Sequence, residues 1–329
     1  MRYKIFALLT LIMGVFLWSS ARVLPGSVLI LGGDSVEIVG KRLSDAGIIR
    51  SEIMFKIVYK LFGHGAPVYP GIVEIDARCG LVCVVGEITT LQQRSVRLTF
   101  KEGEDIRDLA NLIEQKQLGT HAALYALVGA PAVTPTDRTV STTDFIFLKD
   151  APSNISLEGY LFPDTYAVSA ETGLRGLVHA MLQNFDRKFT GEMRTTARTQ
   201  NHSIHDVVSV ASILEKEVRG SADRKLVADI LWRRLSKNIG LQVDSSVNYA
   251  VGSENKFTSA KDRATNSLWN TYKFRGLPLG PISNPGLDAL QAALAPTPNE
   301  NWFYLTSPDG TVYYARTLQE HVANKKFLK

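Results

Sequence analysis

The feature that most constrains this chain is an uncharged apolar run at its amino terminus, Ile5–Ala21. Arg2 and Lys4 precede the run, and Arg22 follows it. A run of this length is near the lower limit of the ~17–25 residues that cross the hydrocarbon core of a bilayer. Because positive charge precedes the run, we expect the amino terminus to stay inside and the rest of the chain to lie outside. The sequence therefore predicts a single-pass anchor in the inner (cytoplasmic) membrane. A cleaved signal peptide and a buried core helix are the alternatives.

The net charge is mildly positive and evenly spread. There are 37 lysines and arginines against 32 acidic residues, a formal charge of +5, and the densest basic pairs are Arg233-Arg234 and Lys325-Lys326. Proteins that bind nucleic acids usually concentrate basic residues into a patch or an arm. We therefore expect no nucleic-acid partner, whereas a polyanionic surface or an acidic glycan is compatible with this charge.

The chain has two cysteines, Cys79 and Cys83. Two are too few for a disulfide framework or a zinc ribbon. Their spacing would permit a local disulfide outside the cytosol, although geometry often forbids one. We favour two small apolar residues in and beside a strand-like segment, 81–85, and leave the disulfide open.

The part of the chain that follows the apolar run begins with alternating strands and helices. Segments 28–39 and 96–109 each predict a short strand, a turn containing glycine and a helix with an acidic start. Strand-like residues also lie around 72–75. Segment 129–137, with three prolines, predicts a loop or boundary.

The remainder of the chain is predicted to be mainly helical. Three segments have helical periodicity: 174–189, 203–218 and 222–238. Asp309-Gly310 between two aromatic-rich runs predicts a β-hairpin, and a final helix is predicted from Thr317. Together these patterns predict an α+β fold.

The predicted helix at 203–218 carries a candidate acid. Ser203 with Asp206 three residues later predicts a capping box at its start. Glu215 and Glu217 project from opposite sides of the apolar stripe, and Glu217 has the more apolar neighbours. A carboxyl group against apolar surface is harder to ionise, so its pKa moves toward the range of a general acid. Solvent-facing or salt-bridged glutamates are the alternative.

Five blocks of sequence resemble one known family. ASILEKE, residues 211–217, is similar to the active-site helix of the YceG-like family, the membrane-anchored endolytic murein transglycosylases. The other blocks agree in order along the chain: EGYLFPDTY (158–166), LQVDSSVNY (241–249), NTYKFRGLPLGPISNPG (270–286) and TLQEH (317–321). The resemblance implies a cytoplasmic amino terminus and transmembrane anchor at 1–22, a LysM-like module at 23–95 and a helix-rich YceG-like catalytic domain at 96–329.

The sequence departs from the family pattern at a few places. Ser245 stands where the family usually has proline, Leu279 replaces the second proline of GLPPG, and Val312 occupies a place where histidine is common. The glycine-tyrosine turn of a LysM-like module is poorly matched around 65–69. None of these departures removes the family's acid.

The essential glutamate of the family falls on Glu217. The resemblance implies cleavage of the β-1,4 bond between N-acetylmuramic acid and N-acetylglucosamine in nascent glycan strands. Protonated Glu217 would give its proton to the glycosidic oxygen, and its carboxylate would then take the proton of the muramic C6 hydroxyl as a 1,6-anhydro ring closes. Because the nucleophile belongs to the substrate, no second carboxylate, metal or cofactor is required.

Further residues of the matching blocks are candidate substrate-binding groups. We predict that Gln242, Asn270 and Tyr272 contact the sugars and that Glu158 and Tyr166 line the same cleft, although each could instead brace the fold.

The role of Asp244 distinguishes transglycosylation from hydrolysis. It could be a second carboxylate, which would favour hydrolysis, but we favour an N-cap of a helix beginning at Ser245.

Two other functions stay open at this point. A lysozyme-type peptidoglycan hydrolase would use the same acid with water as nucleophile. A non-catalytic anchored scaffold would bind glycan and position cell-wall synthases. His202 and His205 have too few companions for a metal site. The expected partners are peptidoglycan glycan strands, the membrane and cell-wall synthases.

Overall fold

The computed structural model describes residues 23–328, except 32, 91–94, 142–144, 170–171, 254 and 256–257. The predicted anchor at 1–22 lies outside the described residues. Within the ranges just given, no helix is both long and apolar enough to cross a membrane. The chain separates into two compact units. The first runs to Arg97 and includes 116–118 and 167–173, and the second holds the rest.

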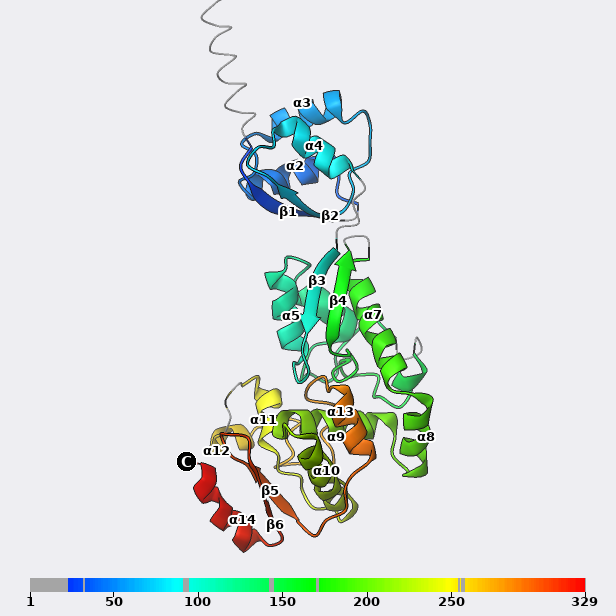
Figure 1. The fold of residues 1–329 in the computed structure, drawn as a ribbon, viewed down its shortest axis with the longest axis vertical. Helices are drawn as coiled ribbons and strands as arrows, with labels where there is room; N and C mark the ends of the chain where they lie inside the picture. The colour runs from blue at the N-terminus through cyan, green and yellow to red at the C-terminus, as the bar shows by residue number, and fades with distance from the viewer. Residues whose placement is uncertain are drawn as a thin grey trace, which may run out of the picture. The chain divides into compact units, whose positions relative to one another are not determined.

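The described residues of the first unit form a two-stranded antiparallel sheet and three helices (Figure 1). The strands are β1 (Gly26–Ile30) and β2 (Gly71–Ile75). The helices are α2 (Val36–Asp45), α3 (Glu52–Phe62) and α4 (Leu81–Thr89). Side chains from all five elements form one apolar core, which includes Ile30, Leu43, Phe55, Val73 and Ile88. The description of residues 23–95 as a LysM-like module stays a prediction.

Residues 81–85 form the first half of α4, so the predicted strand there is wrong. The strand prediction followed the preference of valine for extended backbone. Four residues of α4 are buried and recur at the i, i+3, i+4, i+7 spacing of one helical face: Leu81, Val84, Val85 and Ile88. Burial of that face against the core therefore decides the conformation of this segment.

Cys79 and Cys83 form a disulfide. Cys79 is buried just before α4 begins, and Cys83 lies on the exposed side of its first turn. The interpretation of the two cysteines as unpaired apolar residues is therefore wrong.

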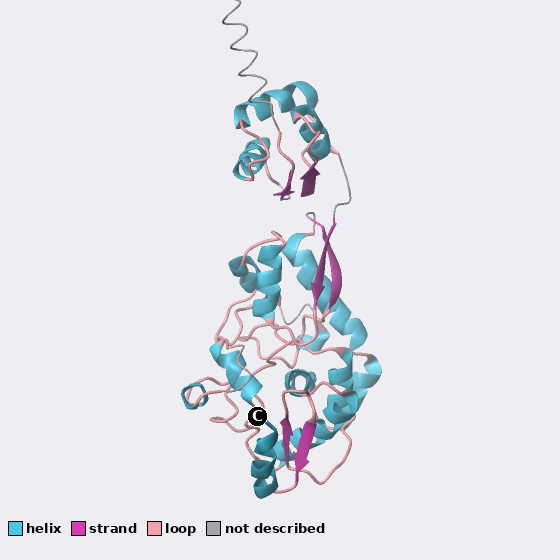
Figure 2. Ribbon diagram, turned by 60° about the vertical axis from the view of Figure 1, so that its left-hand side comes forward, coloured by secondary structure: helices cyan, strands magenta, loops and turns pink. Residues whose placement is uncertain are grey.

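The second unit contains short pairs of strands among many helices (Figure 2). β5 (Phe303–Thr306) pairs antiparallel with β6 (Val312–Ala315). β3 (Ser95–Phe100) pairs with β4 (Asp164–Ser169), and only residues 98–100 and 164–166 of this pair belong to the second unit. The β5–β6 hairpin is the one predicted around Asp309-Gly310, and its turn uses the positive φ of Gly310, 93°. This mixture agrees with the predicted α+β class.

The helix α9 (Ile204–Glu217) packs against α8, α10, α11 and α13 of the second unit. The other helices of this unit, with two short 3₁₀ turns, are α5 (Ile106–Gln115), α6 (His121–Val128), η1 (Ile146–Leu148), α7 (Gly173–Lys188), α8 (Gly191–Thr199), α10 (Ser221–Ser236), α11 (Asp244–Val251), α12 (Ala260–Arg263), α13 (Leu287–Leu294), α14 (Leu318–Asn324) and η2 (Lys325–Leu328). Every residue of α9 from Val207 to Leu214 is buried, so the core of the unit fixes the position of this helix.

Candidate active site

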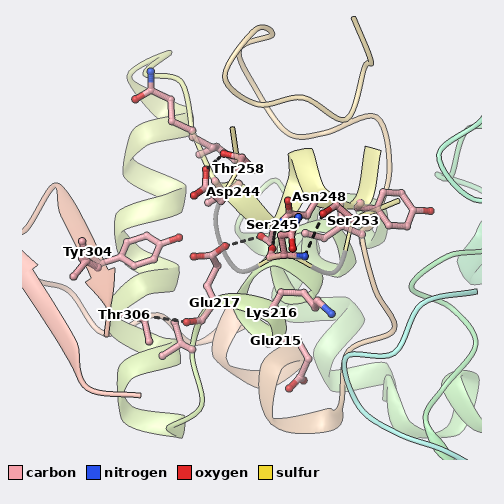
Figure 3. A pocket seen from close by; sticks show the side chains of 18 of the residues that line it. Glu215, Lys216, Glu217, Asp244, Ser245, Asn248, Ser253, Thr258, Tyr304 and Thr306 are labelled. Carbon is pink, nitrogen blue, oxygen red and sulfur yellow. Dashed lines mark hydrogen bonds between the residues drawn. The ribbon is translucent and has the colours of Figure 1, made fainter. Parts of the chain in front are cut away.

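A large cavity of about 1090 Å³, lined by both polar and apolar side chains, lies in the second unit at the carboxyl end of α9. Its walls come from the end of α9, the start of α11, the strand β5 and parts of α5 and of segment 252–263. Figure 3 shows some of the side chains that line it. Four of the residues predicted from the sequence lie in this lining: Glu217, Gln242, Asp244 and Tyr272.

Local sequence fixes where α9 begins and ends. The predicted capping box is present: the Ser203 hydroxyl accepts from the Asp206 N–H at 3.0 Å, and the Asp206 carboxylate accepts from the Ser203 N–H at 2.9 Å. Val218 follows the helix in an extended conformation, so Glu217 is its last residue. The apolar stripe faces the core, and the last turn of α9 reaches the cavity.

Glu217 is half-buried in the cavity wall and is held by a hydroxyl group. Ser245 Oγ donates a hydrogen bond to Glu217 Oε1 at 2.6 Å (Figure 3). Burial raises the pKa of the Glu217 carboxyl, and the negative charge of Asp244 adds to that shift. The hydrogen bond from Ser245 opposes the shift because it favours the carboxylate. Glu217 can therefore hold a proton at a higher pH than an ordinary glutamate.

Glu215, two residues earlier on α9, has both of its oxygens engaged by other groups. Arg224 pairs with Oε1, and the Gly286 N–H donates to Oε2 at 3.0 Å. Arg224 also binds Asp288, with Nη1 to Oδ2 at 2.6 Å. Burial raises the pKa of Glu215 as well. The ion pair nevertheless ties this carboxylate into the packing of α9, α10 and α13, which leaves Glu217 as the available acid.

Asp244 does not cap α11, so the predicted N-cap is wrong. It is the first residue of the helix, and Val243 precedes it without a side-chain cap. The Asp244 carboxylate instead accepts two hydrogen bonds at Oδ1, from Thr258 Oγ1 at 2.6 Å and from the Tyr272 hydroxyl at 2.7 Å. These long-range partners draw the carboxylate away from the helix N–H groups and into the cavity.

Gln242 and Tyr272 flank Asp244 in the lining. Gln242 is exposed and has a positive φ of 53°. Tyr272 is 36% exposed, and the Arg263 guanidinium lies over its ring at 5.5 Å. An exposed amide and an exposed aromatic face suit hydrogen bonding to sugars and stacking on a sugar ring.

Glu158 lies outside the cavity lining, so the structure does not support its predicted contact with substrate. It is 2% exposed, and its carboxyl group accepts from the Ile106 N–H at 3.1 Å, the Tyr249 hydroxyl at 3.1 Å and Asn284 Nδ2 at 2.6 Å. Burial raises the pKa of this carboxyl well above its usual value. Glu158 therefore braces three distant segments of the unit.

Asn270 and Tyr166 are also buried outside the lining. Asn270 Nδ2 donates to two backbone carbonyls at 2.9 and 2.8 Å, and its Oδ1 accepts from the Tyr272 N–H at 3.0 Å. The Tyr166 hydroxyl donates to the Phe162 carbonyl at 2.5 Å and accepts from Asn184 at 3.0 Å. Asn270 thus acts on the cavity only by holding the backbone of Tyr272.

The structure brings further side chains to the site, among them Ser245, Thr258, Tyr304 and Thr306. Ser245 stood out in the sequence as a departure from the family's proline. The other three carried no signal, because their contacts join segments far apart in the chain.

His202 and His205 have structural partners. His202 stacks on Trp232 with ring centroids 3.8 Å apart, and His205 Nδ1 lies 3.0 Å from the Tyr160 hydroxyl. In the described part of the chain, no three His, Cys, Asp or Glu residues are grouped so that they could hold a metal ion.

A half-buried acid with a raised pKa in the wall of a cavity defines a site of the general acid–base class. Comparison with known proteins gives the family. The model of the YceG-like family matches residues 28–327. The chain belongs to the YceG-like family, which confirms the resemblance read from the five sequence blocks.

Individual relatives agree with this assignment. A protein of Bacillus subtilis named endolytic murein transglycosylase is 27% identical over 302 residues, which cover 90% of this chain and 83% of that protein. A Streptococcus pneumoniae protein of the same name is 27% identical over 311 residues, which cover 89% of this chain and 56% of the relative. The chain thus spans only about half the length of the pneumococcal protein. The crystal structure of a yceG-like protein of Listeria monocytogenes is 27% identical, has a TM-score of 0.60, and matches over 91% of this chain and 98% of that one.

Proposed function

We propose that this chain is an endolytic peptidoglycan lytic transglycosylase, which cleaves β-1,4 bonds between N-acetylmuramic acid and N-acetylglucosamine in nascent glycan strands and so limits strand length. The observation that carries the proposal is Glu217, a carboxyl group with a raised pKa in the wall of a large cavity. The names of the relatives support murein as the substrate.

In the first step Glu217 acts as a general acid. It gives its proton to the glycosidic oxygen while the bond from that oxygen to the muramic C1 breaks, and the electron pair stays on the departing oxygen. An oxocarbenium-like state develops at C1. The raised pKa of Glu217 serves this step because the group must be protonated near neutral pH.

In the second step the same residue acts as a base. The muramic C6 hydroxyl bonds to C1, and the Glu217 carboxylate takes the hydroxyl proton, which closes the 1,6-anhydro ring and regenerates the acid. Between the two steps Glu217 carries a negative charge. The Ser245 hydroxyl, which donates to Glu217 Oε1 at 2.6 Å, stabilises that charge.

Hydrolysis is the second candidate, and Asp244 is the observation that favours it. Asp244 lines the same cavity and its charge acts on Glu217, so it could orient a water molecule. We favour transglycosylation because two hydroxyl groups already hold Asp244 Oδ1, which suits a carboxylate that positions Thr258 and Tyr272.

Mass spectrometry of the products tests this proposal. Residues 23–329 would be incubated with uncrosslinked glycan strands, with Glu217→Gln as the matched control. Anhydro-muramic ends from the wild type alone are expected. Reducing ends would mean hydrolysis and would implicate Asp244. Absence of cleavage by both proteins would favour the glycan-binding scaffold that positions synthases.

The location of the protein is part of the same proposal. We infer one anchor within residues 1–22, a LysM-like module that contacts glycan, and a catalytic unit outside the inner membrane. The apolar run Ile5–Ala21 supports the anchor, and the Cys79–Cys83 disulfide is typical of proteins in oxidising compartments. The full chain should fractionate with membranes and residues 23–329 should not. Membrane association of the shortened chain would contradict a single anchor.

A further inference from the structure

Tyr304 on β5 has a hydroxyl group that the mechanism above does not use. The side chain lines the cavity, and its Oη is shielded from solvent. Among the residues that the structure describes, this oxygen has no hydrogen-bond partner. A buried hydroxyl without a partner is unfavourable, so it calls for an explanation at a candidate active site.

The position of Tyr304 follows from the way that β5 is attached to α9. Thr306 Oγ1 donates a hydrogen bond to the backbone carbonyl of Glu217 at 2.9 Å. Residues two apart on a strand face the same side, so Tyr304 and Thr306 both face the end of α9. The contact at Thr306 therefore brings the Tyr304 ring alongside the Glu217 side chain.

Figure 3 shows the resulting arrangement. The Tyr304 hydroxyl is turned toward the Glu217 carboxyl group, and Ser245 approaches that group from the other side. The two side chains are also coupled electrostatically. Burial raises the pKa of Tyr304 well above its usual value, and the charge of Glu217 is the next largest cause. Tyr304 is therefore a protonated donor at neutral pH.

The neighbouring hydroxyl groups are already engaged. Ser245 donates to Glu217 at 2.6 Å, and Tyr272 donates to Asp244 at 2.7 Å. Tyr314, which lies opposite Tyr304 in the hairpin, donates to Asp223 at 2.6 Å. Tyr304 differs from these three because its donor is unused.

We propose that Tyr304 is a positioning residue whose hydroxyl becomes the second hydrogen-bond donor to Glu217 after Glu217 has given up its proton. This inference rests on the proposed function, in which Glu217 gives up its proton in the first step and carries a negative charge until the second. With Ser245 on one side and Tyr304 on the other, a small rotation of the carboxylate engages both donors. Hydrogen bonds to a charged acceptor are about twice as strong as neutral ones, so the second donor acts mainly on the ionised state.

Tyr304→Phe tests the proposal, because it removes the hydroxyl and keeps the ring. We expect kcat for strand cleavage to fall about tenfold with an unchanged KM, as for the loss of one hydrogen bond to a charged group. The basic limb of the pH profile should move to higher pH, since Glu217 would ionise less readily. Tyr313→Phe, on the same hairpin but outside the cavity lining, is the matched control and should leave kcat and the profile unchanged.

A second measurement does not depend on turnover. The titration of Glu217 can be followed by NMR of protein labelled with ¹³C at the glutamate carboxyl carbons, with the signal assigned from its loss in Glu217→Gln. Tyr304→Phe should raise the pKa of Glu217, and Tyr313→Phe should not.

The two measurements separate the possible failures. Unchanged kcat and unchanged titration in Tyr304→Phe would overturn the inference and leave the proposed function standing. A raised KM with an unchanged titration would overturn it too, in favour of a hydroxyl that contacts the sugar. If the wild type cleaves nothing, the proposed function fails. The NMR titration then tests by itself whether the Tyr304 hydroxyl stabilises ionised Glu217.

Discussion

Glu158 and Glu217 are two shielded carboxyl groups of the same unit with very different surroundings. Glu158 is 2% exposed and accepts hydrogen bonds from three segments, so its hydrogen-bonding capacity is largely used. Glu217 opens onto a cavity, is held by Ser245, and has an unused donor, Tyr304, beside it. Burial raises the pKa of both groups. A raised pKa therefore does not distinguish a structural acid from a chemical one, whereas spare hydrogen-bonding capacity beside a cavity does.

The largest effect should come from Glu217→Gln. The amide keeps the shape of the side chain but cannot give and retake a proton, so we expect turnover to fall roughly 10³-fold. The midpoint of thermal unfolding should stay at or above that of the wild type, because a neutral amide replaces a carboxyl group whose ionisation burial disfavours. Rates of glycan-strand cleavage and a melting curve measure the two effects. Substantial residual turnover would place the acid elsewhere.

Glu158→Ala should mainly lower the stability of the fold, whereas Glu217→Gln should mainly lower turnover. It removes the acceptor of three hydrogen bonds and leaves the Ile106 N–H, the Tyr249 hydroxyl and the Asn284 amide without it. We expect the free energy of unfolding to fall by about 3 kcal/mol, since each unsatisfied buried donor costs roughly 1–3 kcal/mol. Denaturant titration measures this loss, with Glu192→Ala on the exposed side of α8 as control. If Glu158→Ala unfolds like the wild type yet fails to cleave, Glu158 belongs with the cavity and the comparison is wrong.

Ser245→Ala should have the smallest effect of these three. Its hydrogen bond lowers the pKa of Glu217 against the larger influence of burial, so its loss should raise that pKa further. Because the first step needs protonated Glu217, the basic limb of the pH–rate profile should move to higher pH. The turnover number should fall about tenfold, since the carboxylate between the steps is less stabilised. A profile identical to that of the wild type would show that Ser245 has no influence on the acid.

Local patterns in the sequence were enough to predict α9, its capping box and the hairpin. Each depends on residues a few positions apart, such as Ser203 with Asp206. The prediction of a strand at 81–85 is wrong because the valine-rich sequence favours extended backbone, whereas a helix buries Leu81, Val84 and Val85 on one face.

The candidate site was only partly predictable. The family blocks contain both Glu217 and Glu158, but a motif does not separate a residue that lines a cavity from one that braces the fold. The contact of Glu158 with Asn284 spans 126 positions, and that of Thr306 with Glu217 spans 89. Such contacts follow from the tertiary fold, so Tyr304 and Thr306 could not be found from the sequence alone.

The position of Glu217 as the last residue of α9 has a consequence for its proton. The aligned peptide dipoles of a helix place partial negative charge at its carboxyl end, where the final carbonyl groups lack partners within the helix. That field disfavours a carboxylate and favours its protonated form, the reverse of the effect at the amino ends of helices that bind phosphate. Thr306 neutralises part of the field by donating to the Glu217 carbonyl. The helix backbone itself thus helps to keep the acid protonated, and the strand β5 limits how strongly it does so.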